Sequence, residues 1–247
     1  MQRELTERYG ELERWHWWFR GRQRILEEVL RRELGGRMGL SVVSIGCGPV
    51  EGLAWLLPMA GPGGRVIGID CEPTHGRQRP SQLTFAAGRF ESIPLASGSC
   101  DVVVALDVLE HVADDAASLR EAARLLRPGG LLLVTVPALP SLWSGHDVMN
   151  QHVKRYTKET LQQAFAGARL SLTRMTYFNT LLFPPIAALR WSRRALGLHT
   201  RPRSDFEDSR PGLVNDLLAR TFSWERHLVG RLELPVGVSL LAVARCA

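Results

Sequence analysis

The stretch that decides the fold reads Val42-Val43-Ser44-Ile45-Gly46-Cys47-Gly48-Pro49-Val50-Glu51-Gly52. A short apolar run leads into a glycine-rich turn, and a helical pattern follows the turn. Because glycine has no Cβ, Gly46 and Gly48 allow unusual backbone angles and let a ligand touch the main chain. The stretch therefore predicts a strand, a sharp turn and a helix, with a ligand at the turn.

A second apolar run, Arg65-Val66-Ile67-Gly68-Ile69-Asp70, ends in a carboxylate. In a doubly wound sheet, an acid at the end of the second strand accepts hydrogen bonds from both hydroxyls of a ribose. The turn has the spacing G-x-G-x-x-x-G, not the G-x-G-x-x-G of dinucleotide enzymes. These features favour a nucleoside ligand without a pyrophosphate; the alternative is a plain tight turn and a solvated Asp70.

Strand and helix patterns alternate along the chain, which predicts an α/β fold with a parallel sheet and right-handed crossovers. The expected strands lie near 42–46, 65–70, 83–87, 101–106, 131–136, 170–177 and 236–246. The expected helices lie near 51–60, 73–79, 114–127, 157–167 and 213–230. The last two strands are expected to pair as an antiparallel hairpin that closes the sheet.

Three later segments follow the glycine turn in a recognisable order. They are Asp101-Val-Val-Val-Ala-Leu-Asp107-Val-Leu-Glu-His111, Leu125-Leu-Arg-Pro-Gly-Gly130 and Leu131-Leu-Leu-Val-Thr-Val-Pro137. Together with the first two strands, they resemble the class I S-adenosylmethionine (SAM) dependent methyltransferases over nearly the whole chain. The resemblance implies a doubly wound, seven-stranded, mostly parallel Rossmann-like sheet, SAM as the cofactor, and an enzyme of the EC 2.1.1 type.

The N-terminal segment carries an unusual density of aromatic residues in Trp15-His16-Trp17-Trp18-Phe19. This H-W-W-F start and a later H-D…H…R-Y loop resemble a bacterial subgroup that acts on small molecules. Residues 1–34 are expected to form a helical lid, broken near Gly10 and Gly21. Residues 35–247 would then form the SAM-binding domain, with a helical insertion at about 178–232.

The resemblance also assigns the donor site. The residues expected to contact SAM are Gly46, Gly48, Asp70, Phe90, Leu106, Asp107, Trp18 and Arg22. Arg22 is expected to bind the donor carboxylate, and Phe90 either contacts adenine or packs in the core. The chain departs from the family at Ser44 and Arg89, where an acid is usual, so adenine is expected to contact backbone and apolar groups.

The acceptor wall is expected in the polar loop 138–156, which follows the fifth strand. A hydroxyl or ammonium acceptor needs a base before it can attack a methyl group, and histidine suits that task near neutral pH. The candidate bases are His146, His152 and His111. His146 is preferred, because Gly145 and Asp147 suggest a constrained turn. In the alternative, the loop is a scaffold in which Asp147 pairs with Arg155.

Composition narrows the classes of partner. The net charge is +6, but the arginines are spread along the chain beside acids, so no nucleic-acid partner is expected. The four cysteines lack the spacing of a disulfide framework, so a cytoplasmic location is expected. They also lack metal-ligand spacing, and no third ligand stands at helical spacing to the histidines, so no metal site is expected. The apolar segment 181–194 is too short for a membrane span and suits peripheral membrane contact, a cap over a greasy substrate or a homodimer surface.

These features predict a methyltransferase that acts on an oxygen or nitrogen of a small, hydrophobic, glycan or natural-product acceptor. One alternative is a nucleic-acid methyltransferase, but Leu106-Asp107-Val108-Leu109 replaces the Asn/Asp-Pro-Pro-aromatic run of base-amino enzymes. The other is a SAM-dependent cyclase or a non-catalytic SAM binder on the same scaffold, because a fold does not fix a function.

Overall fold

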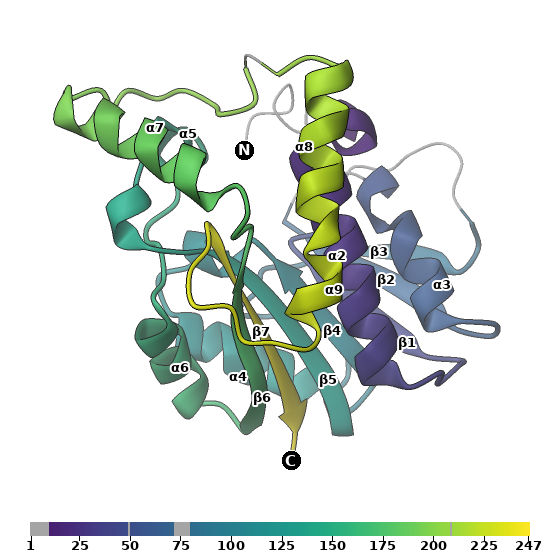
Figure 1. Ribbon diagram of the computed structural model, residues 1–247. Coiled ribbons are helices and arrows are strands. Elements are labelled where there is room, and N and C mark those ends of the chain that lie inside the picture. The colour runs from purple at the N-terminus through teal and green to yellow at the C-terminus, as the bar shows by residue number, and fades with distance from the viewer. Residues whose placement is uncertain (1–9, 49, 72–79, 208) are drawn as a thin grey trace.

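The computed structural model describes residues 10–48, 50–71, 80–207 and 209–247. Its centre is a seven-stranded sheet in the order β3-β2-β1-β4-β5-β7-β6 (Figure 1). The strands are β1 (Ser41–Ile45), β2 (Arg65–Asp70), β3 (Leu83–Ala87), β4 (Cys100–Leu106), β5 (Leu126–Pro137), β6 (Leu170–Phe178) and β7 (Ser239–Cys246). The first five are parallel, and β7 is antiparallel to both its neighbours. The expected mostly parallel sheet with a late hairpin is confirmed.

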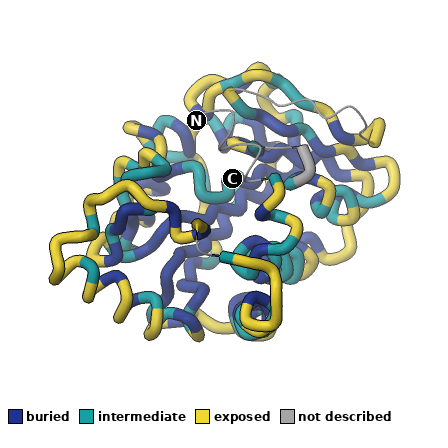
Figure 2. The backbone as a smooth tube through the Cα atoms, turned by 90° about the horizontal axis from the view of Figure 1, so that it is seen from above, coloured by how far each residue is buried: buried dark blue, intermediate teal, exposed yellow. Residues whose placement is uncertain are grey.

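Helices cover both faces of the sheet, with α4 and α6 on one face and α2, α8 and α9 on the other (Figure 1). The α-helices are α2 (Trp17–Leu34), α3 (Leu57–Ala60), α4 (Asp115–Leu125), α5 (Gly145–Met149), α6 (Lys158–Ala166), α7 (Phe183–Ala195), α8 (Leu213–Trp224) and α9 (Arg226–Val229). Short 3₁₀ helices are η1 (Val50–Leu56), η2 (Leu109–His111) and η3 (Pro140–Leu142). Buried residues accordingly fill the middle of the molecule (Figure 2).

The central strands are apolar for a physical reason. A parallel strand covered on both faces needs side chains that can be buried in both directions. All five residues of β1 are buried, and so are six of the seven in β4. These strands end at the turn around Gly46 and at Asp107, on neighbouring positions of the same sheet edge. The strand order reverses between β1 and β4, and such a switch point is where open α/β sheets bind ligands.

Helix α2 runs without a break through Gly21, so the expected break there is wrong. The break lies at His16, which has an extended backbone. Its side chain caps the helix by accepting the Trp18 N–H at Nδ1, at 3.2 Å. A Cβ at Gly21 would lie 2.2 Å from Cδ1 of Phe222, so glycine here allows close packing of α2 on α8. The second half of α2, including Ile25 and Leu26, belongs to the main hydrophobic core.

Several other boundaries differ from the sequence-based expectations. The segment that opens with Asp107 forms only the short 3₁₀ helix η2; Asp107 has a positive φ of 56°, and α4 starts later, capped by the side chain of Asp114. The helix expected near 51–60 is a 3₁₀ helix followed by one α-turn, and the one near 213–230 breaks at Glu225. The helix expected at 73–79 lies outside the described residues.

The chain between β6 and β7 contains α7, α8 and α9. Residues 199–207 contact the rest of the protein through particular side chains. Asp205 pairs with Arg190, and Phe206 joins a small core with Leu12 and Phe19. Among the described residues, no helix combines the length and the apolar character that crossing a membrane requires.

Candidate active site

A cavity of about 1360 Å³ opens at the carboxyl edge of the sheet, between the N-terminal half of α2, the strand ends and α7. Every residue predicted to contact the donor or the acceptor lines this cavity. They are Trp18, Arg22, Gly46, Gly48, Asp70, Phe90, Leu106, Asp107, His111, His146 and His152. Segments that are up to 134 residues apart in sequence (Trp18 and His152) therefore meet in one space.

The glycine turn is held in shape by its own backbone and by Asp70. Gly46 and Gly48 have positive φ angles of 61° and 58°, which side chains with a Cβ rarely adopt. A Cβ on Gly46 would also lie 2.5 Å from the side chain of Val108. The Gly48 N–H donates to Oδ2 of Asp70 at 2.9 Å, which links the ends of β1 and β2. The turn thus presents main chain and one carboxylate to the cavity.

An ion pair joins α2 to the end of β4. Arg22 donates to Oδ2 of Asp107, and its guanidinium also lies 4.3 Å from the ring centre of Trp18. Both charged side chains are largely buried, with exposures of 14% and 19%. Stacking on tryptophan and pairing with a carboxylate fix the guanidinium from two sides. The contact places the start of α2 over the donor end of the cavity.

The residues that follow β3 offer fewer contacts for a ligand than the resemblance implies. Phe90 is buried in the main core and also lines the cavity, so core packing and ligand contact are combined in one side chain. Arg89 has an 80% exposed side chain that lies 3.8 Å from Glu91. A guanidinium has no acceptor atom, so Arg89 cannot bind the adenine amino group.

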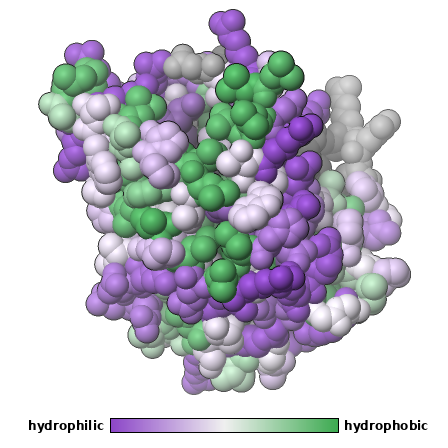
Figure 3. Space-filling model, in the orientation of Figure 1, coloured by the Kyte–Doolittle hydropathy of each residue, from purple (hydrophilic) through white to green (hydrophobic). Residues whose placement is uncertain are grey.

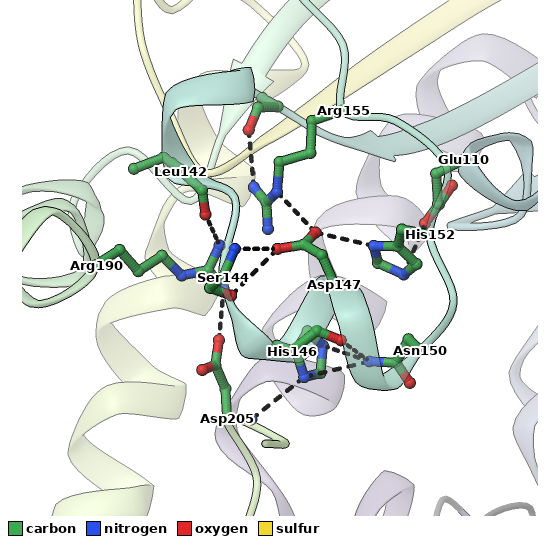
Figure 4. A network of polar contacts seen from close by, with 11 residues as sticks. Glu110, Leu142, Ser144, His146, Asp147, Asn150, His152, Arg155, Arg190 and Asp205 are labelled. Carbon is green, nitrogen blue, oxygen red and sulfur yellow. Dashed lines mark hydrogen bonds and ion pairs between the residues drawn. The ribbon is translucent and has the colours of Figure 1, made fainter. Parts of the chain in front are cut away.

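The wall that the sequence predicts for the acceptor is built around the buried carboxylate of Asp147 (Figure 4). Its Oδ2 accepts the Ser144 N–H at 2.8 Å, which caps helix α5. Its Oδ1 accepts from Nε of Arg155 at 2.7 Å and from Nδ1 of His152 at 2.9 Å. Burial alone would raise the pKa of Asp147, but His152 and Arg155 outweigh it and hold that pKa below its usual range. The expected Asp147–Arg155 pair is confirmed, and the segment is a capped helix followed by a turn.

The three candidate histidines differ in the hydrogen-bond partners of their ring nitrogens and in their pKa values. His146 accepts the backbone N–H of Asp205 at Nδ1, at 3.2 Å, and burial lowers its pKa to about 4. Burial likewise lowers the pKa of His111 to about 4, with a further contribution from His152. His152 donates through Nδ1 to Asp147, so its Nε2 points away from that carboxylate, toward Glu110 (Figure 4).

Glu110 is the residue that sequence reasoning missed. Its side chain is fully buried, and neither carboxylate oxygen has a hydrogen-bond partner in another residue. Oε1 lies 3.9 Å from Nε2 of His152, beyond hydrogen-bond distance. Burial, and then the charge of Asp107, raises the pKa of Glu110 well above its usual value. Glu110 lies in the 3₁₀ helix η2, and no residue nearby in sequence reveals that it would be buried and unpaired.

Two loops are tied together beneath these groups. The Val153 N–H donates to the carbonyl of Glu110 at 2.9 Å. The Tyr156 hydroxyl donates to the carbonyl of Leu109 at 3.1 Å and also contacts Asp115 at 3.1 Å. Because these bonds join the segment around Val153 and Tyr156 to the turn around Leu109 and Glu110, they fix His152 over that turn.

Other cavity residues were also missed, because their role depends on tertiary contacts. Asn179 is 1% exposed, has a positive φ of 57° and has no partner for either amide atom. Arg190 donates to the Leu142 carbonyl at 3.0 Å and pairs with Asp205, which closes the wall behind His146. The only signals in the sequence were the arginine concentration near 190–203 and the apolar segment before it.

Large apolar side chains are exposed on α7 and α8. Hydrophobic residues gather over α7 and α8 in the space-filling view (Figure 3). On α7, Leu189 lines the cavity and is 52% exposed, and Trp191 is 47% exposed. On α8, Leu213 and Leu217 are 89% and 65% exposed. Of these side chains, Leu189 lines the cavity.

Comparison with known families matches residues 43–134 to a family described as "Methyltransferase domain". A Mycolicibacterium smegmatis protein, named as an S-adenosylmethionine-dependent methyltransferase, is 34% identical over 53% of this chain and 50% of its own length. A ubiquinone biosynthesis O-methyltransferase of Methylobacterium sp. is 39% identical over 38% of this chain and 39% of its own length. The chain spans half or less of the length of these curated relatives.

The fold is shared with solved structures at lower identity. A complex of the Haloferax volcanii Trm112 methyltransferase activator with a methyltransferase contains a chain that is 20% identical, with a TM-score of 0.59. The alignment covers 98% of this chain and 94% of that one. At this identity the likeness shows the fold alone. Together with the matched domain, it supports a class I S-adenosylmethionine-dependent methyltransferase with SAM as its cofactor.

Proposed function

We propose that the protein transfers a methyl group from SAM to an oxygen or nitrogen atom of a small-molecule acceptor. The observation that carries this proposal is a single cavity that joins the glycine turn and Asp70 to a histidine-lined wall. Pockets for one drug-sized ligand measure about 300–1,000 Å³. A volume of about 1360 Å³ leaves room for a donor and an acceptor side by side.

The donor half has a residue for each part of SAM. The backbone at Gly46 and Gly48 would contact the methionine portion, and Asp70 would accept from the ribose hydroxyls. Phe90 would contact adenine. Arg22 has several N–H donors in a planar fork, so it can hold the donor carboxylate and Asp107 together. Leu106 and Asp107 would then lie beside the sulfonium.

The N-terminal segment would serve as the lid. Trp18 and Arg22 lie over the donor end of the cavity, and His16 and Trp17 line the same space. Methyl transfer is an in-line displacement that depends on holding sulfur, methyl carbon and acceptor atom in a row. A wall of tryptophan excludes water, which strengthens the electrostatic contacts that align the donor.

Among the three histidines, His152 is best placed to activate the acceptor. His146 accepts the Asp205 N–H at Nδ1, and the side-chain nitrogen of Asn150 lies 3.1 Å from its Nε2, so both ring nitrogens already have partners within the protein. His152 resembles the histidine of an Asp–His pair, because Asp147 fixes its tautomer and leaves the Nε2 lone pair free. That lone pair can take a proton from the acceptor or bind a cation.

The lining favours an acceptor with an apolar body and a few polar groups. Trp17, Ile186, Leu189 and Phe206 supply apolar walls, and Asn179 supplies an amide without a protein partner. A buried amide is stable when a ligand completes its hydrogen bonds. Relatives named as ubiquinone biosynthesis O-methyltransferases support an oxygen atom as the methyl acceptor.

The test is a binding and labelling experiment on the whole chain. S-adenosylhomocysteine (SAH) should bind with one site per chain in a calorimeter. Isotope-labelled SAM should then transfer its methyl group to members of a panel of phenols, carboxylic acids and amines, and not to RNA or DNA. If SAH does not bind, or if label appears only in nucleic acid, the proposal is wrong.

A further inference from the structure

Three side chains that no methyl-donor contact uses lie together on the cavity wall. Glu110, His111 and His152 each place one ligand-type atom within 4.8 Å of the other two. Glu110 comes from the turn after β4, and His152 comes from the turn after α5 (Figure 4). Glu110 and His111 are neighbours in sequence, and the fold brings His152 to them.

The carboxylate of Glu110 requires a partner. Its side chain is completely buried, and both of its oxygens lack a hydrogen-bond donor from another residue. Other buried charges in the same wall are paired, Asp147 with Arg155 and Arg190 with Asp205. An unpaired buried carboxylate is costly, whereas a cation beside it removes the cost.

The imidazoles have the outer contacts that metal-binding histidines show. His152 donates Nδ1–H to Asp147, which Arg155 holds in turn, and its Nε2 faces Glu110. His111 has a hydrogen bond to the backbone of Gln151. Histidines that bind metals usually donate their second ring nitrogen to a carboxylate or a carbonyl, which fixes the tautomer. The left-handed backbone of Gln151, with φ 57°, marks a constrained turn next to the site.

We propose that Glu110, His111 and His152 bind one divalent transition-metal ion, with its remaining coordination positions open to the cavity. Two imidazoles and one carboxylate form a set that suits Zn²⁺ or Fe²⁺ better than Mg²⁺ or Ca²⁺, which prefer oxygen ligands alone. Ligand atoms around Zn²⁺ are about 3.3 Å apart, so the side chains close in from 4.8 Å when the ion binds.

The ion would deepen the proposed methyl transfer, and this consequence rests on that function. A hydroxyl bound to a divalent ion loses its proton at lower pH, and here the proton would leave to water through the cavity mouth. The oxygen lone pair would then form the new C–O bond as the C–S bond of SAM breaks, with the electron pair going to sulfur. His152 would act as a ligand and not as a base.

The experiment uses the full chain after treatment with a chelator and its removal. Titration with ZnCl₂ should show one ion bound per chain, and Co²⁺ should give a visible absorption band typical of nitrogen and oxygen ligands. His152→Ala and Glu110→Gln should each weaken Zn²⁺ binding about tenfold or more. His227→Ala, which removes an exposed histidine on α9, should bind Zn²⁺ like the wild type.

The proposal is overturned if the wild type gives no cobalt band, or if the variants bind Zn²⁺ as tightly as the wild type. If a variant fails to fold, as thermal unfolding would show, the wild-type cobalt spectrum still decides. SAH titration of the same sample separates the two proposals. SAH binding without Zn²⁺ binding overturns only the metal site, and Zn²⁺ binding without SAH binding overturns only the methyl transfer.

Discussion

The two halves of the cavity, one proposed to bind the donor and the other the acceptor, differ in the groups that form them and in how far apart those groups lie in sequence. The centre of the donor half is the glycine turn with Asp70, whose parts follow one another within about one strand–helix–strand unit. The acceptor half uses side chains from segments as distant as Glu110 and Asp205, joined by buried charges around Asp147. Changes in the donor half should therefore alter affinity for SAM, and changes in the acceptor half should alter the rate.

The largest effect should come from the acceptor half. His152→Ala should lower turnover about 10²- to 10⁴-fold, whether the lost group binds a proton or an ion. SAH affinity, measured by calorimetry, should remain near the wild-type value because His152 contacts no donor residue. Asn150→Ala is the matched control on the same loop, and its turnover should change less than that of His152→Ala. Full turnover of His152→Ala would remove the distinction between the two halves.

The next effect should come from the donor half. Asp70→Ala removes the acceptor for two ribose hydroxyls, at a cost of about 2–4 kcal/mol. Calorimetry should show SAH binding weakened about tenfold or more. The variant also loses the bond from the Gly48 N–H, so thermal unfolding must accompany the titration. An unchanged SAH affinity would show that Asp70 does not hold the ribose.

The lid depends on the contact between α2 and α8. Gly21→Ala would place a methyl group 2.2 Å from Phe222, and such overpacking costs about 1–3 kcal/mol. Denaturant unfolding should show this loss, and adding Phe222→Leu should recover part of it. Gly167→Ala is the control, because its Cβ would meet only ordinary contacts at 3.6 Å. Equal stability of Gly21→Ala and wild type would mean that the helices move apart freely.

The N-terminal cap should respond to pH. Burial, then the neighbouring His146, lowers the pKa of His16 to about 4 from 6.5. A lowered pKa means that the unfolded chain binds the proton first, so the stabilisation is complete above pH 6.5 and is lost as pH falls toward 4. At one and a half units below the unfolded pKa, the loss is about 2 kcal/mol.

His16→Asn keeps a good helix cap and removes the titrating group. The free energy of unfolding of this variant should fall less between pH 7 and pH 5 than that of the wild type. The two falls should differ by about 2 kcal/mol. The measurement is denaturant unfolding at both pH values. Identical pH dependence would show that other buried histidines, such as His111 and His146, account for the whole effect.

The smallest effect should be slower amide hydrogen exchange in the N-terminal segment when SAH binds, without a change in its structure. Amide hydrogen exchange across residues 11–24 should slow when SAH is added, because Trp18 and Arg22 would order over the donor. Exchange in α6, which lies on the other face of the sheet, should stay the same. If the N-terminal segment exchanges at the same rate with and without SAH, it packs on the core and has no role as a lid.

The fold and the donor half were accessible from sequence because local patterns determine them. The apolar run before Gly46 must be a buried strand, and Asp70 must follow the next one. The acceptor half was accessible only as a list of histidines. The burial of Glu110, the free nitrogen of His152 and the unpaired amide of Asn179 all follow from contacts between distant segments. No local sequence pattern predicts which ring nitrogen of a histidine will hydrogen-bond to a given carboxylate.

The packing of Gly21 on Phe222 has a consequence for how the protein is made. One helix of that contact lies near the start of the chain, and the other lies between residues 213 and 224. During synthesis, the early helix cannot meet its partner until residues 213–224 have left the ribosome. Until then its tryptophans remain exposed, and the nascent sheet lacks both its last strand and a closed cavity. Slow translation near the C-terminus would lengthen the period in which the chain is open to aggregation.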